Sequence, residues 1–167
     1  MSVANKLVES DFNVIREAWD RLAPLPGGPR LFSRAVGLFA PYTGSVHAQV
    51  VDLRRNYCRC VLRDRWGVRN HLTSIHAVAL ANLAEMTGNL ALAYSLPDDG
   101  RFIVAGMDME YVKKARGRIV AVCDSVMPET NERQEIPVVV EMRDRVGDLV
   151  ARATLRSLVG PKRGSAA

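Results

Sequence analysis

The sequence is poor in aromatic residues and in cysteine. Aromatic side chains make up only 6% of the 167 residues, too few for the base-stacking surfaces of single-stranded nucleic-acid binders. The three cysteines, Cys58, Cys60 and Cys123, cannot pair off evenly, and no second Cys/His cluster completes a zinc set. We therefore expect reduced thiols in a cytoplasmic protein that has no metal site and no nucleic-acid partner.

The sequence also lacks a good membrane segment. Its first ten residues, MSVANKLVES, do not contain the apolar core of a signal peptide. The longest apolar stretch, residues 76–96, carries Glu85 near its centre. A charge at that depth costs about 2.5–3.5 kcal/mol in a bilayer. The stretch is therefore predicted to be a helix buried in protein, without membrane insertion.

The charge balance is only weakly basic. Twenty-three Lys and Arg residues against 18 Asp and Glu residues give a net charge of +5. Such an excess favours a phosphate-bearing ligand. A generically basic protein without such a ligand would have the same balance, so charge alone leaves both interpretations open.

The hydrophobic periodicity changes along the chain and predicts an α+β domain. Helices are expected at residues 10–23, capped by Ser10, and at residues 31–40. Strands are expected at residues 46–53, 57–65, 101–112, 117–126, 136–143 and 149–158, with the long apolar helix between the second and third. Residues 1–30 are interpreted as a helix and a Pro/Gly linker, residues 31–160 as the domain and residues 161–167 as a disordered tail.

The long helix is apolar nearly all round, and one curved sheet can cover only part of it. The remaining face is predicted to meet the same helix of a second subunit. We therefore expect a homodimer or a dimer of dimers.

Three polar residues interrupt this helix. Asn82, Glu85 and Asn89 follow i, i+3, i+7 spacing and share one stripe. The stripe is either a structural hydrogen-bond network or a reactive carboxylate held in a dry cleft. Gly88 implies close approach of a ligand or a backbone, or tight helix packing.

The start of the helix offers a second feature. With Ser74 as N-cap, the amides of the next four residues lack intrahelical acceptors and could stabilise an oxyanion. Ala77 precedes Glu85 by eight residues, about 12 Å along the axis. One subunit cannot bring both to one carbonyl group, whereas two antiparallel helices can.

The segment NHLTSIHAVALANLAEMTGN, residues 70–89, resembles the signature of the hotdog-fold thioesterases, including those of phenylacetate degradation. The matching features are Asn70, His76 six residues later, and the Leu-Ala-Glu that ends at Glu85. The chain from residue 31 to about 159 is most similar to a hotdog branch carrying NH…HA.AL.NLAE. The resemblance implies a curved antiparallel sheet wrapped around a long central helix.

The resemblance also implies roles for individual residues. Glu85 falls on the base or nucleophile, Ala77 on the glycine whose amide polarises the thioester carbonyl, Asn70 on a residue that helps to hold that carbonyl, and Asn89 on a position that orients water. The family's glycines are replaced by Thr73, Ala77 and Val78.

The substrate-binding residues are expected to surround these positions. In a dehydratase His76 would be the general base, but the acidic position here matches the thioesterase pattern, so His76 is interpreted as accessory. Asn82 and Gly88 are expected to line the same cleft. A basic cluster around Gly117 matches the strand that lies beside coenzyme A in the family; it is either an exposed strand end or a phosphate clamp made of Lys113, Lys114 and Arg116.

The resulting hypothesis is an acyl-CoA thioesterase that acts on a fatty-acyl or aryl-CoA at a composite dimer site. Coenzyme A enters only as part of the substrate, and no separate cofactor is expected. The alternative is a hotdog protein that binds acyl-CoA or fatty-acyl groups without catalysis.

Overall fold

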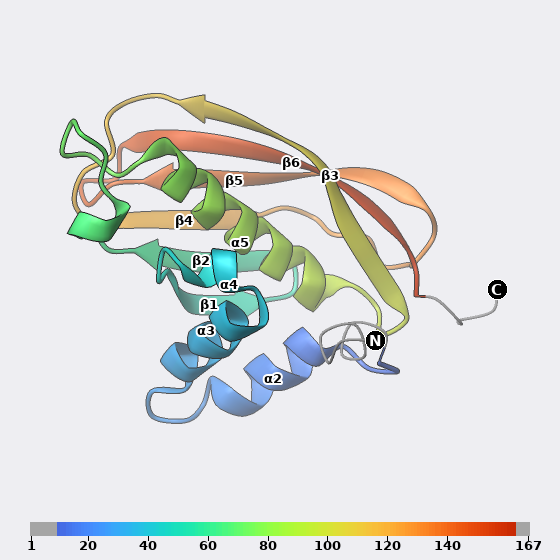
Figure 1. Cartoon of the computed structure of the whole chain (residues 1–167). Coiled ribbons are helices and arrows are strands. Elements are labelled where there is room, and N and C mark those ends of the chain that lie inside the picture. Colours follow the sequence, from blue (N-terminus) through green and yellow to red (C-terminus); the bar gives the residue numbers. More distant parts are fainter. Residues whose placement is uncertain (1–9, 163–167) are drawn as a thin grey trace.

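The computed structural model describes residues 10–162 as one antiparallel sheet of six strands with helices against it (Figure 1). The sheet order is β1-β2-β4-β5-β6-β3. The strands are β1 (Gln49–Arg54), β2 (Tyr57–Leu62), β3 (Gly100–Tyr111), β4 (Ile119–Asp124), β5 (Gln134–Arg143) and β6 (Leu149–Pro161). All six predicted strands are present, and the α+β class is confirmed.

Helix α5 (Ala77–Ser95) crosses one face of the curved sheet, as predicted (Figure 1). Twelve of its 19 residues are buried. Gly88 faces the sheet, where an added Cβ would lie 3.2 Å from side-chain atoms of Leu155 and Val138 and 3.3 Å from Val140. The missing side chain therefore lets the helix pack closely on β5 and β6.

Part of the helix surface is covered by the chain's own N-terminal helices, α2 (Val14–Leu22), α3 (Gly28–Phe39) and the short α4 (Pro41–Gly44). Trp19 of α2 and Phe32 of α3 are buried and meet edge to face, with their ring centroids 5.1 Å apart. The apolar character of α5 thus reflects two coverings, the sheet and these helices.

The expected N-cap of the first helix is wrong. Asn13, not Ser10, caps α2: its side chain accepts a hydrogen bond from the Arg16 amide. The same side chain donates to the carbonyls of Ala93 and Leu96 at the end of α5. Asn13 therefore joins α2 to the central helix, and long-range bonds of this kind leave no local sequence signal.

Two predicted boundaries also need correction. Residues 28–30 belong to α3 and not to a linker, because Pro29 suits the first turn of a helix. An added Cβ on Gly28 would lie 1.7 Å from the Leu22 carbonyl oxygen, so the α2–α3 turn requires a glycine there. At the other end, β6 continues to Pro161, and Lys162 donates to the Ser10 carbonyl. The rest of the predicted tail lies outside the described residues.

The three cysteines are buried and form no disulfide in the structure. Cys58 and Cys123 lie at opposite register positions of the neighbouring strands β2 and β4. Burial raises the pKa of Cys123 to about 11. In the described part of the chain, no group of three or more His, Cys, Asp and Glu side chains could hold a metal ion. No helix in this part is long and apolar enough to cross a membrane.

Strand β3 forms one edge of the sheet and pairs only with β6. It is 12 residues long, and its exposed apolar side chains include Ile103, Met107 and Tyr111. A long edge strand with exposed apolar side chains can pair with another chain.

Candidate functional site

The N-terminus of α5 leaves one amide without an acceptor. The N-cap is His76, not the expected Ser74, and its Nδ1 accepts a hydrogen bond from the Val78 amide at 3.1 Å. The Ile75 amide donates to Ala115 and the His76 amide to Val68, both at 2.8 Å. Within residues 10–162, the Ala77 N–H alone among the four expected amides stays unpaired.

The loop before this helix is folded around Asn70. Its Oδ1 accepts from the Leu72 amide at 2.9 Å and from the Ser74 amide and hydroxyl at 3.3 and 3.1 Å. The Asn70 side-chain oxygen thus holds the loop. The N–H groups of the same side-chain amide remain able to donate to a ligand. Thr73 lies in the same loop at a left-handed φ of +55°, which explains why a glycine is usual at that position of the family signature.

We expect Thr73→Gly to stabilise the protein by up to about 1 kcal/mol, because a β-branched residue is strained at positive φ. The greater entropy of glycine in the unfolded chain offsets part of this gain. Urea unfolding of both proteins measures the difference. A clear loss of stability would show that contacts of the Thr73 side chain outweigh its backbone strain.

Glu85 and Asn89 lie on the face of α5 that the fold leaves partly open, together with Ala81 and the exposed Val78. Glu85 is half-buried and makes no hydrogen bond or ion pair with any residue from 10 to 162. The Asn89 Oδ1 is buried and also lacks a donor there. Two acceptors, four residues apart, therefore have no donor among the described residues.

The structure does not bring Asn82 and Gly88 together with Glu85. The Asn82 side chain is buried against α4 and donates to the Tyr42 carbonyl at 2.9 Å. Gly88 contacts β5 and β6, which agrees with the alternative of tight helix packing. The interpretation of the polar stripe as one hydrogen-bond network is wrong, because neither amide bonds to Glu85.

The basic loop at 112–118 runs beside the start of α5. The Ile75–Ala115 hydrogen bond fastens the loop to the helix entry, and the Gly117 amide donates to Asp64 at 2.9 Å. Lys114 and Arg116 are exposed and make no ion pair within the described residues. Both can therefore bind an anion near the unpaired Ala77 amide.

Lys113 differs from its neighbours. Its Nζ lies 2.7 Å from Asp144 and 2.6 Å from Asp148. The hydrogen bonds to Asp144 and Asp148 raise the pKa of Lys113. Because two carboxylates already neutralise this ammonium group, the expected clamp loses Lys113 and is reduced to Lys114 and Arg116.

Sequence reasoning missed two residues at this end of α5. The Tyr111 hydroxyl donates to the Ala77 carbonyl at 3.2 Å. Asp64 accepts from Arg69 and from the Gly117 amide, and the Arg69 hydrogen bond lowers its pKa most. Both residues fix the loops around Ala77, but a lone Tyr or Asp carries no signal of such contacts in a sequence.

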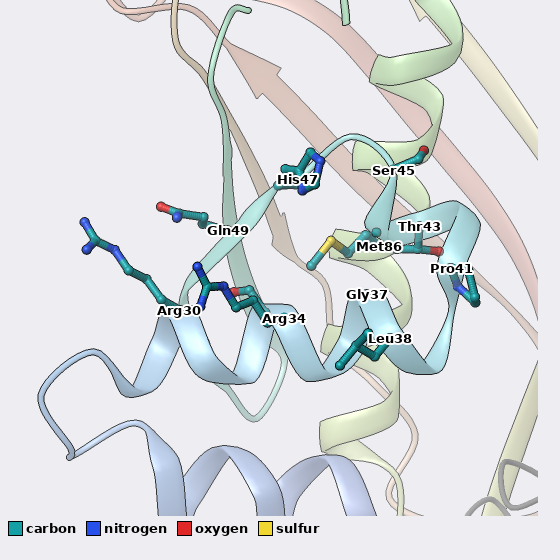
Figure 2. A pocket seen from close by; sticks show the side chains of 13 residues that line it. Arg30, Arg34, Gly37, Leu38, Pro41, Thr43, Ser45, His47, Gln49 and Met86 are labelled. Atoms are coloured by element: carbon teal, nitrogen blue, oxygen red, sulfur yellow. The ribbon is translucent and has the colours of Figure 1, made fainter. Parts of the chain in front are cut away.

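Two cavities lie between the N-terminal helices and α5. The first, of about 690 Å³, opens between α3, α4 and β1 and is shown in Figure 2. The second, of about 510 Å³, lies between α2, α3, α5 and β3. Asn89 lines the second cavity, whereas Glu85 lines neither.

The fold and the helix entry define the class of protein. A curved antiparallel sheet around one long helix, entered through a loop with a residue at positive φ, is the hotdog fold, which solved proteins named as thioesterases share. The chain belongs to the family described as "Domain of unknown function (DUF4442)", whose model matches residues 28–159. No functionally curated protein matches the sequence.

Solved structures show the same architecture. A crystal structure of a genomics target is 30% identical, with a TM-score of 0.75, and the match covers 88% of this chain and 98% of that one. A Pseudomonas aeruginosa protein named as a probable thioesterase is 20% identical, with a TM-score of 0.67 and coverages of 82% and 97%. A Haemophilus influenzae thioesterase is 12% identical, with a TM-score of 0.65 and coverages of 75% and 87%.

Proposed function

We propose that this protein hydrolyses acyl-CoA thioesters at two composite sites, each formed by Glu85 of one subunit and the Ala77 amide of the other. The observation that carries the proposal is the unpaired Ala77 N–H at the start of a 19-residue helix. Helix N-termini with free amides stabilise negative charge. Relatives of the same fold named as thioesterases support the reaction class.

The axial distance along α5 supports a site shared between subunits. Ala77 and Glu85 are about 12 Å apart along one helix, too far for one carbonyl group to meet both. Two antiparallel copies of α5, related by a two-fold axis, bring Glu85 of each beside Ala77 of the other. The open face of α5 and the unpaired edge of β3 provide the surfaces for this pairing.

The chemistry follows from the residues at the proposed site. A water molecule donates one hydrogen bond to Glu85 and another to the Asn89 Oδ1, which has no protein donor. As the water attacks the thioester carbon, Glu85 takes a proton from the water. The carbonyl oxygen of the thioester becomes an oxyanion that accepts a hydrogen bond from the Ala77 amide. The carbon–sulfur bond then breaks, Glu85 passes the water proton to the leaving thiolate, and a carboxylic acid and free coenzyme A leave. In a variant of this route, the Glu85 carboxylate attacks the carbon directly and expels the thiolate, and water then hydrolyses the resulting mixed anhydride to the carboxylic acid and free Glu85.

A dimer in solution is the first requirement of this proposal. Sedimentation velocity at micromolar concentration is expected to give a species of twice the chain mass or more, and a stable monomer would contradict the proposal. Substituting Met107→Lys on the exposed edge of β3 is expected to weaken the dimer, because a charge there opposes strand pairing. Glu132→Lys, at an exposed residue outside the strands, is the matched control.

Lys114 and Arg116 are proposed to hold the phosphates of coenzyme A. The double substitution Lys114→Glu and Arg116→Glu is expected to raise KM for an acyl-CoA about tenfold or more, with kcat little changed. The KM for a short thioester without the nucleotide should stay within about twofold, because it presents no phosphate to the loop. Arg59→Glu and Arg133→Glu, at exposed sites away from this loop, control for net charge. Equal effects on both substrates would exclude a phosphate clamp.

The second candidate function is binding of acyl-CoA without turnover. One observation favours it: Val78, half exposed at the helix start, replaces a glycine of the family signature and narrows the approach to Ala77. Hydrolysis assays with a panel of acyl-CoAs separate the two candidates, because the binding protein would bind the panel and release no thiol.

A further inference from the structure

The first cavity has a basic end and no acidic lining. Arg30 and Arg34 extend from α3 toward the strand that carries Gln49, and His47 lies above them (Figure 2). None of the 13 lining residues is Asp or Glu. The cavity is therefore electropositive at this end.

The basic side chains at this end have no partners within the part of the chain described. Arg30 and Arg34 make no ion pair or side-chain hydrogen bond, and neither does the imidazole of His47. The two arginines are four residues apart on α3, so their like charges repel each other, and α3 contains no acidic residue. An anion between them would remove this repulsion.

The backbone at His47 is also unusual. His47 has a left-handed φ of +52°, although it is not a glycine. Residues held in such conformations gather at ligand sites, where the surrounding structure keeps them in place. Here α4 and β1 hold His47 at the rim of the cavity.

The second cavity adjoins the first and has a mostly apolar lining. It shares Thr43 and Met86 with the first cavity, so the two are neighbours. The flexible thioether side chain of Met86 lies where they meet and can change rotamer to admit a chain. Apolar residues from α2, α3, α5 and β3 line this second cavity, among them Val36, Phe39, Leu90 and Phe102.

We propose that the two cavities together bind one anionic amphiphile, a medium-chain fatty carboxylate. The carboxylate lies between Arg30 and Arg34, whose guanidinium groups match its planar shape and charge. The alkyl chain passes Met86 and fills the apolar cavity, where each methylene removed from water adds to affinity. This site does not require the proposed hydrolysis: Arg30 and Arg34 lie outside that site, and Asn89 is the one residue that the two sites share.

Calorimetry with decanoate, using the uncharged 1-decanol as comparison ligand, tests both halves of the site. The double substitution Arg30→Gln and Arg34→Gln is expected to weaken decanoate binding about tenfold or more and to leave decanol binding unchanged. Added salt should weaken decanoate binding in the wild type and have little effect in the variant. Arg59→Gln and Arg145→Gln, at exposed sites outside both cavities, control for net charge and should bind decanoate like the wild type.

A substitution in the apolar cavity tests the position of the chain. Ala93→Phe, on α5, fills part of this cavity and is expected to weaken binding of both ligands. Circular dichroism and the melting temperature show whether each variant is folded. The proposal is overturned if the wild type binds no decanoate, or if a folded Arg30→Gln, Arg34→Gln protein binds it as tightly as the wild type. Decanoyl-CoA binding with no decanoate binding would likewise assign the cavities to the intact thioester and overturn the proposal.

Discussion

Replacing Glu85 with Gln is expected to abolish hydrolysis and to leave the fold intact. An amide can neither take a proton from water nor attack a carbonyl carbon. Loss of a general base alone lowers kcat about 10²–10⁴-fold, and loss of a nucleophile lowers it further. Stability should hold or rise, because Glu85 is half-buried and has no hydrogen-bond or ion-pair partner within residues 10–162 whose loss would destabilise the fold.

The expected variant is folded, dimeric and inactive, and it still binds acyl-CoA. Melting temperature and hydrolysis rate, measured side by side on the wild type and Glu85→Gln, separate the possibilities. Glu132→Gln, at an exposed residue outside the strands and helices, is the matched control. Turnover of Glu85→Gln at the wild-type rate would remove Glu85 from the mechanism, and absence of turnover in both proteins would favour the binding protein.

Replacing Ala77 with Pro is expected to lower kcat about 10²–10³-fold, the usual effect of removing one donor to a developing oxyanion. Proline lacks only the amide hydrogen that the mechanism uses. It suits the first position of a helix, and His76 already has the extended conformation, with ψ of 140°, that precedes a proline. The helix should therefore keep its start, and the melting temperature should change little.

Ala77→Gly is the control for this experiment, because it keeps the amide N–H and removes only the methyl group. It should retain most of the wild-type activity, with a small loss of stability. If Ala77→Pro is folded and as active as Ala77→Gly, the amide of residue 77 does not bind the oxyanion, and the proposed site is wrong at its central point.

The fold could be predicted because its signals are periodic. Alternating strands and one long apolar helix gave the α+β class, and the resemblance of residues 70–89 to the hotdog signature implied the hotdog fold. Boundaries were less certain where distant residues decide them. Asn13 caps α2 and also bonds to the end of α5, and no local pattern indicates such a bond.

The candidate site was predicted in part for a similar reason. Helical spacing placed Glu85 and Asn89 on one face, and the structure agrees. The same spacing also suggested Asn82 and Gly88 as substrate-binding residues. A period of 3.6 residues does not distinguish the open face of a helix from the flanks that meet α4 and the sheet. Likewise, the charge of Lys113 was visible in the sequence, but its two aspartate partners, 31 and 35 residues away, were not.

The central claim is that one site needs Glu85 from one subunit and the Ala77 amide from the other. The most direct measurement is the activity of a purified heterodimer of one Glu85→Gln subunit and one Ala77→Pro subunit, isolated through two different affinity tags. If each site is shared between subunits, one of the two sites of the heterodimer is intact, because it combines Glu85 of the Ala77→Pro subunit with the Ala77 amide of the Glu85→Gln subunit. The heterodimer should then show about half of the wild-type activity although both parent homodimers are inactive. A heterodimer as inactive as its parents would place both groups in the same subunit and contradict the account.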